Sequence, residues 1–586
     1  MGLVNNISFP THYLGHTLDL VLTRQADSVN LVTSPLEYIS DHLGIKVQLS
    51  INKPSSTNKL ITYRKVNDIN VDNFRSDLLE CDLISNLDHF DDLGELVDKY
   101  NSSLEMLLEK HAPMKEKIIK IRESAIWYNS ALRALKKTKR YYENNWVKNR
   151  TSQNLDLFKH FKNEYTLACN KVKTEYYSKL FSDCGSNQRK IYKLIDDLTN
   201  GDPPPKYPIE SNNIILANNF CEFFTSKIEN IVSDIEVTVE SESLTEIIQY
   251  DLLDDSFSPL EDFREITREE LESVMSSLGN KYSPLDPLPT SLIKKFIDIL
   301  IKPIHKIINR SLESGIFPQQ LKSAVITPII KKNNLEAEYQ NFRPVSNIPY
   351  LSKLIEKVVL SQCMPHFITS NQYSKNNSAY MKNNSTETLL AKVHSDVIEN
   401  TDKKMITLLV LIDLSAAFDS LNQEKLIHIL ENRFKITGNS LNWFKTYLIG
   451  RSQRVIVNST LSSAKPLKYG VPQGSCLGPV AFLAYTSAIY NIIHRYNISV
   501  EAYADDTQLY IACDPSNKSI SIKLNILERC IQDVRTFLLT HQLKINDNKT
   551  ELIIIGNRQQ LAKIDFESIS LRVGSSNIRP TSKKKT

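Results

Sequence analysis

The clearest hydrophobic runs along the chain are short and strand-sized. One runs from Ile406 to Ile412 and is followed directly by Asp413, and another spans residues 324–330. Both are long enough for buried strands and too short for most helices. Strand-forming residues also flank the adjacent acids Asp505 and Asp506, which predicts a hairpin with both acids at its tip. No stretch approaches 18 uninterrupted apolar residues, so we expect a soluble chain with no membrane partner.

The texture of the sequence changes along the chain and predicts several regions. Residues 1–50 contain two strand-like runs, 18–22 and 44–49, whereas residues 51–262 are charged and mostly helical in period. Residues 263–400 contain helix pairs followed by the 324–330 run, and residues 401–556 alternate short apolar strands with helices, which favours an α+β fold. We therefore expect four regions: 1–50, 51–262, 263–556 and a short tail, 557–586.

Composition excludes a few classes of protein and leaves most open. The 71 Lys and Arg residues nearly balance the 67 Asp and Glu residues, so net charge alone does not indicate a nucleic-acid partner. Hydrophobic residues make up 41% of the chain, which is typical of globular proteins. The eight cysteines include no C-x-x-C pair, which argues against a zinc module and suits a reducing compartment.

The acids at the strand ends are the first candidate chemistry. If Asp413, Asp505 and Asp506 meet across neighbouring strands, they form a hard-oxygen site of the kind that Mg²⁺ prefers. Two such ions about 4 Å apart can activate a 3′-hydroxyl and stabilise a leaving pyrophosphate. A lone Asp-Asp pair is more often a polar turn, but the local concentration of glycine in a glycine-poor chain favours a metal site. Three of the 15 glycines fall within nine residues, around Gln473.

At this point the sequence resembles the reverse transcriptases of LINE-type (non-long-terminal-repeat) retrotransposons, in the jockey-like and chicken-repeat-like group. The resemblance covers about 270 to 556, and it implies a right-hand polymerase with fingers and a ferredoxin-like palm sheet. The matching segments stand in family order, and Ser283–Pro289 upstream also looks like that group: Phe317-Pro318 through Lys332, Asn341–Ser346, Leu411–Asp419, Gly470–Ser475, Tyr503–Asp506, Leu543–Asn546 and Asn548–Thr550.

The resemblance also implies roles for individual residues. Asp413, Asp505 and Asp506 match the metal-binding acids, and the implied cofactor is a pair of Mg²⁺ ions, for which Mn²⁺ can substitute. Phe418 matches the bulky residue that excludes a ribose 2′-hydroxyl, and Lys549 matches a lysine proposed to protonate pyrophosphate. The remaining positions match nucleotide-binding residues: Lys331, Arg343, Gln473 and Gly474.

Three positions depart from the family pattern. Asn377 stands where the family usually has Gln, and Met381 stands where it usually has Arg. Asn384 also occupies a position at which His is common. These changes put a template or nucleotide contact in doubt, whereas the catalytic acids are intact.

The first 50 residues carry a weaker resemblance. The segment 16–23 followed by Ser40-Asp41-His42 resembles the C-terminal end of the apurinic-type endonuclease domain that precedes these reverse transcriptases. Asp19, Asp41 and His42 match its late catalytic positions. We expect 1–50 to be a remnant of that α/β domain, 51–262 a partly basic helical connector, and 557–586 the truncated start of a thumb.

The stretch from Lys110 to Arg150 combines 12 Lys and Arg residues with three Glu. Its aromatic residues are consistent with RNA binding through phosphate contacts and base stacking, or with a helical bundle that buries them: Trp127, Tyr128, Tyr141, Tyr142 and Trp146. The sequence leaves both alternatives open.

The function that these observations predict is an RNA-directed DNA polymerase that performs target-primed reverse transcription. Its expected partners are element RNA, a DNA primer or target site, dNTPs and an element-encoded RNA-binding protein. We expect nuclear action after cytoplasmic ribonucleoprotein assembly. Phe418 and Ala504 argue against an RNA-dependent RNA polymerase. A catalytically inactive, truncated element product that at most binds RNA is the alternative.

Overall fold

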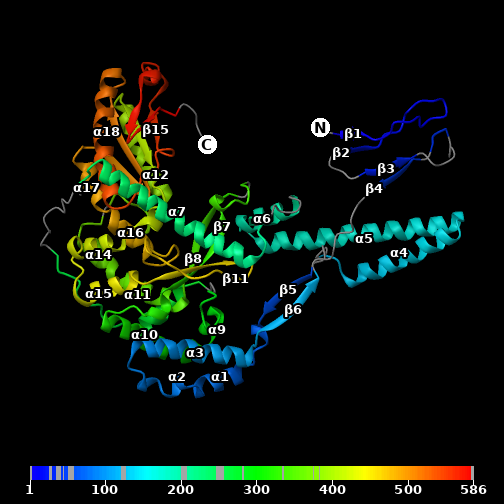
Figure 1. The fold of residues 1–586 in the computed structure, drawn as a ribbon, viewed down its shortest axis with the longest axis horizontal. Helices are drawn as coiled ribbons and strands as arrows, with labels where there is room; N and C mark the ends of the chain where they lie inside the picture. The colour runs from blue at the N-terminus through cyan, green and yellow to red at the C-terminus, as the bar shows by residue number, and fades with distance from the viewer. Residues whose placement is uncertain are drawn as a thin grey trace. The chain divides into compact units, whose positions relative to one another are not determined.

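The computed structural model describes residues 3–24, 29–33, 41–43, 45–49, 58–120, 127–185, 187–199, 207–245, 257–279, 283–332, 335–373, 375–381 and 383–581. These residues fall into two units, and each is described by itself (Figure 1). The first unit comprises residues 1–64 and 114–199, and the second comprises residues 65–113 and 200–586. None of the described helices is long and apolar enough to span a membrane.

The strands of the first unit form three antiparallel pairs: β1 (Leu3–Asn5) with β2 (Leu22–Arg24), β3 (Val29–Thr33) with β4 (Lys46–Leu49), and β5 (Asn58–Tyr63) with β6 (Lys115–Lys120). The expected strand at 18–22 begins only at Leu22. Upstream, the Thr11 hydroxyl accepts the backbone N–H groups of Leu18 and Asp19, which keeps them out of a ladder. The run at 44–49 forms β4 from Lys46 to Leu49; Ile45 precedes the strand, and Gly44 lies outside the described residues.

Three helices complete the first unit: α4 (Ser130–Lys148), α5 (Ser152–Cys184) and α6 (Gln188–Thr199). The aromatic residues of α4 pack against α5. The Tyr142 ring stacks on Phe161 with centroids 4.3 Å apart, and the Trp146 ring stacks on Phe158 at 5.7 Å. Because residue numbers rise on one helix as they fall on the other, the helices form an antiparallel hairpin. This geometry favours the helical-bundle alternative for these two rings.

The helices of the second unit surround one large hydrophobic core. They are α1 (Val71–Glu80), α2 (Asp82–Ser85), α3 (Leu93–His111), α7 (Asn213–Ser241), α8 (Arg268–Ser277), α9 (Thr290–Lys295), α10 (Ile297–Ser314), α11 (Tyr350–Thr369), α12 (Thr386–Asp402), α13 (Ala417–Ser420), α14 (Gln423–Asn432), α15 (Gly438–Leu448), α16 (Gly478–Thr486), α17 (Ala488–His494), α18 (Asn517–Thr540) and α19 (Arg558–Leu561).

A four-stranded antiparallel sheet carries the candidate acids. Its order is β13 (Ser499–Tyr503), β14 (Asp506–Cys513), β9 (Ile406–Ile412), β15 (Glu551–Ile555). With the intervening helices this is a βαββαβ arrangement. One face contributes Leu408 and Val410 to the main core, and the other packs Leu409 against α12. Burial on both faces explains why β9 is apolar at every position except Thr407.

A second sheet has the order β11 (Thr460–Leu461), β10 (Ser452–Val457), β7 (Ser323–Ile330), β8 (Phe342–Asn347), with β12 (Lys465–Pro466) also paired to β10. The predicted strand at 324–330 is therefore confirmed. Helix α7 covers one face of this sheet, where Phe220 and Phe224 pack with Ile326, Phe342 and Val455. Figure 1 shows α7 running from this sheet toward α18.

The C-terminal residues form a β-hairpin of β16 (Leu571–Val573) and β17 (Ser576–Ile578), which contacts α18. Leu571 and Val573 are fully buried in the main core of the second unit. The described part of the tail thus packs as an extension of this unit.

Candidate active site

Three carboxylates meet at one end of the βαββαβ sheet. Asp413 directly follows β9, and Asp506 begins β14, which pairs antiparallel to β9 with Thr507 opposite Ile412. This register sets Asp506 beside Asp413, and Asp505 occupies the turn before it. The Lys549 ammonium lies 2.9 Å from the Asp413 carboxylate. The structure therefore brings together the four residues that the sequence analysis proposed as catalytic.

The electrostatics of this cluster confirm that the acids influence one another. The pKa of Asp505 is raised by burial and by the negative charges of Asp506 and Asp413, while Lys549 opposes the rise. The pKa of Asp506 is raised by burial and by Asp413, again opposed by Lys549. One ammonium cannot offset three converging carboxylates. The donor set of three hard oxygens suits divalent cations such as Mg²⁺.

The turn that carries Asp505 is strained and clamped. Ala504 has φ +60°, a conformation that residues with a Cβ rarely adopt, and such strain persists only where the surroundings enforce it. The buried Asn377 side chain supplies that constraint. Its amide nitrogen donates to the Ala504 carbonyl at 3.3 Å and to the Tyr490 hydroxyl at 3.1 Å, and its oxygen accepts from Ala504 at 3.4 Å.

Asn377 therefore acquires a positioning role that the sequence analysis missed. Residues next to it continue the sheet edge, because Ala502 donates to the Asn376 carbonyl and Ser378 donates to the Ala502 carbonyl. The departure from the family pattern at this position thus falls at a contact with the catalytic turn. A single-residue difference in one sequence carries no signal of such a long-range contact.

The glycine-rich segment is required by close backbone approach. Gly470 has φ +74°, and a Cβ there would lie 2.6 Å from the Phe418 carbonyl oxygen. Gly474 has φ +123°, and a Cβ there would lie 2.5 Å from the Ser346 carbonyl oxygen. Between them, the Gln473 carbonyl accepts the Ser346 N–H at 2.9 Å. The loop thereby joins the segment after Asp413 to strand β8.

A buried acid of α11 hydrogen-bonds the backbone of the glycine-rich loop, and the sequence analysis did not find this residue. Glu356 of α11 is fully buried and accepts the backbone N–H of Cys476 at 2.6 Å. Burial raises its pKa, and the positive charge of Arg451 opposes the rise. Arg451 is itself buried over the Tyr447 ring. Glu356 is the single acid of α11, and that isolated acid was the available signal.

The two expected cations of the β7–β8 hairpin occupy different settings. The Lys331 ammonium donates to the Gln340 carbonyl at 2.8 Å, and its pKa is lowered by burial and by the charges of Lys227 and Lys549. Arg343 is exposed on β8, opposite Ile329. Lys331 is therefore electrostatically linked to the carboxylate cluster through Lys549.

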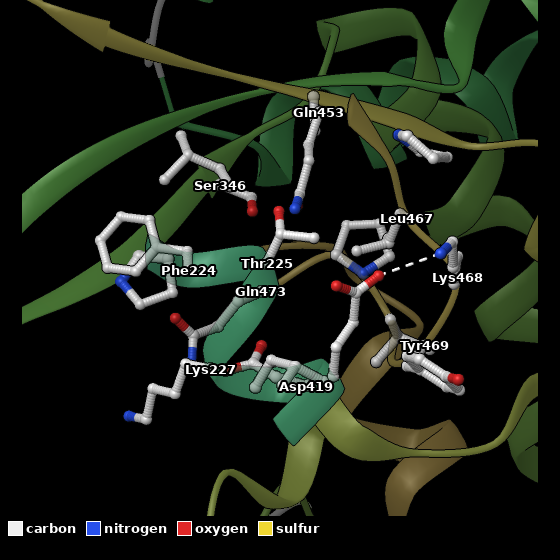
Figure 2. Close-up of a pocket in the computed structure, with 18 of the residues that line it drawn as sticks. Phe224, Thr225, Lys227, Ser346, Asp419, Gln453, Leu467, Lys468, Tyr469 and Gln473 are labelled. Carbon is white, nitrogen blue, oxygen red and sulfur yellow. Dashed lines mark hydrogen bonds and ion pairs between the residues drawn. The ribbon is translucent and has the colours of Figure 1, made fainter. Parts of the chain in front are cut away.

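Gln473 lies at a cavity of about 70 Å³ between the second sheet and α7, and Phe418 is not among the residues that line it (Figure 2). Gln473 lines this cavity together with Ser346 and Asp419. The Phe418 ring packs 4.5 Å from the Phe482 ring, centroid to centroid, and lies five residues after Asp413. Burial raises the pKa of Asp419 to about 6.

The candidate endonuclease residues lie in the first unit. The His42 ring is 2.7 Å from the Asp19 carboxylate, a contact that raises the pKa of His42 and lowers that of Asp19. Asp41 lies 3.6 Å from His12, which the sequence analysis did not select. Among the described residues, His12, Asp41 and His42 form a group that could hold a metal ion.

The fold and the carboxylate cluster are of the kind expected for a polymerase-type nucleotidyltransferase, and comparison with known proteins points the same way. Residues 330–577 match the family described as reverse transcriptase (RNA-dependent DNA polymerase). The chain is 24% identical over 367 residues to the RNA-directed DNA polymerase from mobile element jockey of Drosophila melanogaster, covering 61% of this chain and 39% of the relative.

Two further relatives give the same result. The jockey polymerase of Drosophila funebris is 26% identical, over 41% of this chain and 27% of its own. The probable RNA-directed DNA polymerase from transposon BS of Drosophila melanogaster is 25% identical, over 48% and 31%. Residues 330–577 are thus similar to reverse transcriptases, and the relatives they match include the jockey-like polymerases. The chain spans about a third of the length of these relatives.

Replacing Asn377 by alanine tests the clamp on the catalytic turn. Asn377→Ala leaves buried backbone groups of Ala504 and Ala379 without a partner, which should lower the free energy of unfolding by about 1–3 kcal/mol. Nucleotide incorporation should fall on the order of tenfold or more, because the Asp505 carboxylate loses its position. Urea denaturation and primer extension measure the two effects. The exposed Asn384→Ala is the matched control, and equal behaviour of both variants would contradict the clamp.

Divalent metal should stabilise the protein in a pH-dependent way. The raised pKa values of Asp505 and Asp506 mean that their ionisation destabilises the metal-free fold, and that this cost disappears as pH falls through the folded-state values. Mg²⁺ should therefore raise Tm at neutral pH and progressively less on acidification. Asp505→Asn should raise the metal-free Tm and reduce the Mg²⁺ shift in thermal unfolding. An undiminished shift would place metal binding elsewhere.

Proposed function

We propose that the protein is an RNA-directed DNA polymerase that transfers nucleotides from dNTPs onto a DNA 3′-hydroxyl, using an RNA template in target-primed reverse transcription. The observation that carries this proposal is the convergence of Asp413, Asp505 and Asp506 with Lys549 at one end of the βαββαβ sheet. The similarity of residues 330–577 to the reverse transcriptase family supports the RNA template and the DNA product.

The three carboxylates are the residues that would hold two Mg²⁺ ions, or Mn²⁺ in their place. Metal bound there supplies charge that lowers the pKa of the 3′-hydroxyl and stabilises the leaving pyrophosphate. Asp413 and Asp505 act as the principal ligands and Asp506 as the third acid. This division follows the family motifs that they match; in support, Asp413 directly follows the central strand and Asp505 lies in the clamped turn.

The surrounding residues bind and orient the nucleotide. The Lys549 ammonium, which pairs with Asp413, is positioned to give a proton to departing pyrophosphate. Lys331 and Arg343 supply positive charge to the triphosphate, the lysine as a point charge and the guanidinium as a fork. Gln473 and Gly474 position the nucleotide beside strand β8, and Phe418 excludes a 2′-hydroxyl.

The template and target partners follow from the proposed reaction. Element RNA and a primed DNA target would bind through dispersed cations, and an element-encoded RNA-binding protein is a further candidate partner. Helix α4 offers exposed Arg133, Lys137 and Arg140 for phosphate contacts, while its aromatic rings pack against α5. We place the reaction in the nucleus, after ribonucleoprotein assembly in the cytoplasm.

Primer extension on a poly(rA) template with Mg²⁺ and dTTP tests the proposal. Wild-type protein should extend the primer, and Asp413→Asn should abolish extension while retaining RNA affinity, because template contacts come from dispersed cations. Filter binding of the same RNA is the control. Wild-type rates in the purified Asp413→Asn protein would refute the metal assignment. RNA binding without any wild-type incorporation would instead indicate a catalytically inactive RNA-binding product.

The sugar selectivity of the enzyme should depend on Phe418. A large ring five residues beyond Asp413 would leave no room for a 2′-hydroxyl, so Phe418→Val should allow ribonucleotide incorporation. Single-nucleotide extension with dTTP and UTP measures the discrimination. Its packing partner offers a matched control: Phe482→Leu trims the ring behind Phe418 and should retain more of the discrimination. Unchanged selectivity in Phe418→Val would remove the gate role.

A further inference from the structure

Helix α7 precedes the matched reverse transcriptase region in the sequence. In the fold it packs against elements that support both sheets of the second unit. Near its N-terminus, Phe220 and Phe224 are buried against Phe342 of β8. Just beyond its C-terminus, Glu242 pairs with Arg535 of α18 at 2.7 Å. Figure 1 shows the helix extending from the strands β7 and β8 toward α18. The middle of α7 therefore lies between the β7–β8 strands and α18, and contacts at both ends hold it there.

Lys227 lies in that middle stretch. Helix α7 contacts α13, which follows Asp413 by only a few residues. Lys227 lines the cavity to which Gln473, Asp419 and Ser346 also contribute (Figure 2). The Lys227 side chain thus lines the same cavity as Gln473, the proposed nucleotide-binding glutamine.

Lys227 is also close enough to act on the other cations of the site. Both Lys227 and Lys549 depress the pKa of Lys331, and Lys549 is paired with Asp413. Lys331 thus lies within electrostatic reach of both Lys227 and Lys549, and Lys549 contacts the carboxylate cluster. Positive charges gathered in this way repel one another unless an anion with several charges lies among them. A triphosphate or pyrophosphate meets that requirement.

Three acids of α7 already have basic partners. Glu222 pairs with Lys465, Glu229 pairs with Lys468 at 3.0 Å, and Asp234 pairs with Lys544 at 3.5 Å. Lys227 is the single basic residue of α7, and its side chain forms no ion pair or hydrogen bond with any residue that the structure describes, although its charge opposes the burial-driven rise in the pKa of Asp419. Its exposed ammonium is therefore available to a ligand.

We propose that Lys227 binds the terminal phosphates of the incoming dNTP and of the departing pyrophosphate, together with Lys331 and Lys549. This inference rests on the proposed function and adds a nucleotide-binding residue from outside the matched family region. A lysine suits the role because its compact charge reaches any of several phosphate oxygens. Binding by Lys227 would also make α7 part of the nucleotide site.

Steady-state primer extension with Lys227→Gln, Lys227→Arg and the exposed control Lys445→Gln tests this assignment. Lys227→Gln should raise the KM for dTTP about threefold to tenfold and weaken inhibition by added pyrophosphate by a similar factor, while leaving the Kd for template–primer unchanged. Lys227→Arg should retain most of the wild-type KM. Lys445→Gln should match the wild type.

Two results would overturn the assignment. An unchanged KM and unchanged pyrophosphate inhibition in Lys227→Gln would remove Lys227 from the phosphate site. A weaker Kd for template–primer, with KM for dTTP unaffected, would assign it to the nucleic-acid backbone instead. Failure of the proposed function is distinguishable, because the wild type would then not extend at all. Calorimetric titration with Mg²⁺ and inorganic pyrophosphate would still decide whether Lys227→Gln weakens binding.

Discussion

Mutual repulsion among Asp413, Asp505 and Asp506 is the interaction on which the rest of the structure depends. Carboxylates that share a site raise one another's pKa, and burial of Asp505 and Asp506 adds to the effect. Such a cluster is unstable unless the backbone holds its members in place. The antiparallel pairing of β9 with β14 does so, because its register fixes where each acid leaves the sheet.

Contacts near the carboxylates and farther from them help to hold the three acids in place. Lys549 pairs with Asp413, and Asn377 holds the turn at Ala504 by bonding both its carbonyl and its N–H. Farther away, Glu356 binds the glycine-rich loop at the backbone of Cys476. These groups keep fixed charge and fixed backbone around a space that a metal-bound nucleotide would fill, and such preorganisation lowers the cost of binding the transition state.

Helix α7 links elements of the two sheets that carry the proposed nucleotide-binding residues. Its apolar N-terminal half covers the β7–β8 strands. Three of its acidic residues pair with lysines, two of which precede the glycine-rich loop and one of which follows α18. An element from outside the matched region thus stabilises the arrangement of Lys331 and Gln473. The residues that support the proposed site therefore extend beyond the segment that matches the family.

Sequence by itself determined the strands 324–330 and 406–412, the hairpin that presents Asp505 and Asp506, and the need for glycine at 470 and 474. These features follow from local rules, since apolar runs predict buried strands and clustered glycine predicts close backbone approach. The family resemblance then ordered the motifs along the chain. The same local rules misplaced the strand at 18–22, because the Thr11 hydroxyl takes the backbone donors there.

Tertiary structure alone decided which distant residues complete the site. Asn377 and Ala504 are 127 residues apart, Glu356 and Cys476 are 120 apart, and no local pattern predicts such pairs. The basic and aromatic stretch was equally undecided until α4 met α5, because a Trp or Tyr can stack on a base or fill a helix interface. Lys227 resembles any exposed lysine until the packing of α7 brings its charge to Lys331. The physical reason is common to all three: the value of a polar or aromatic side chain depends on its neighbours, and the folded chain supplies them.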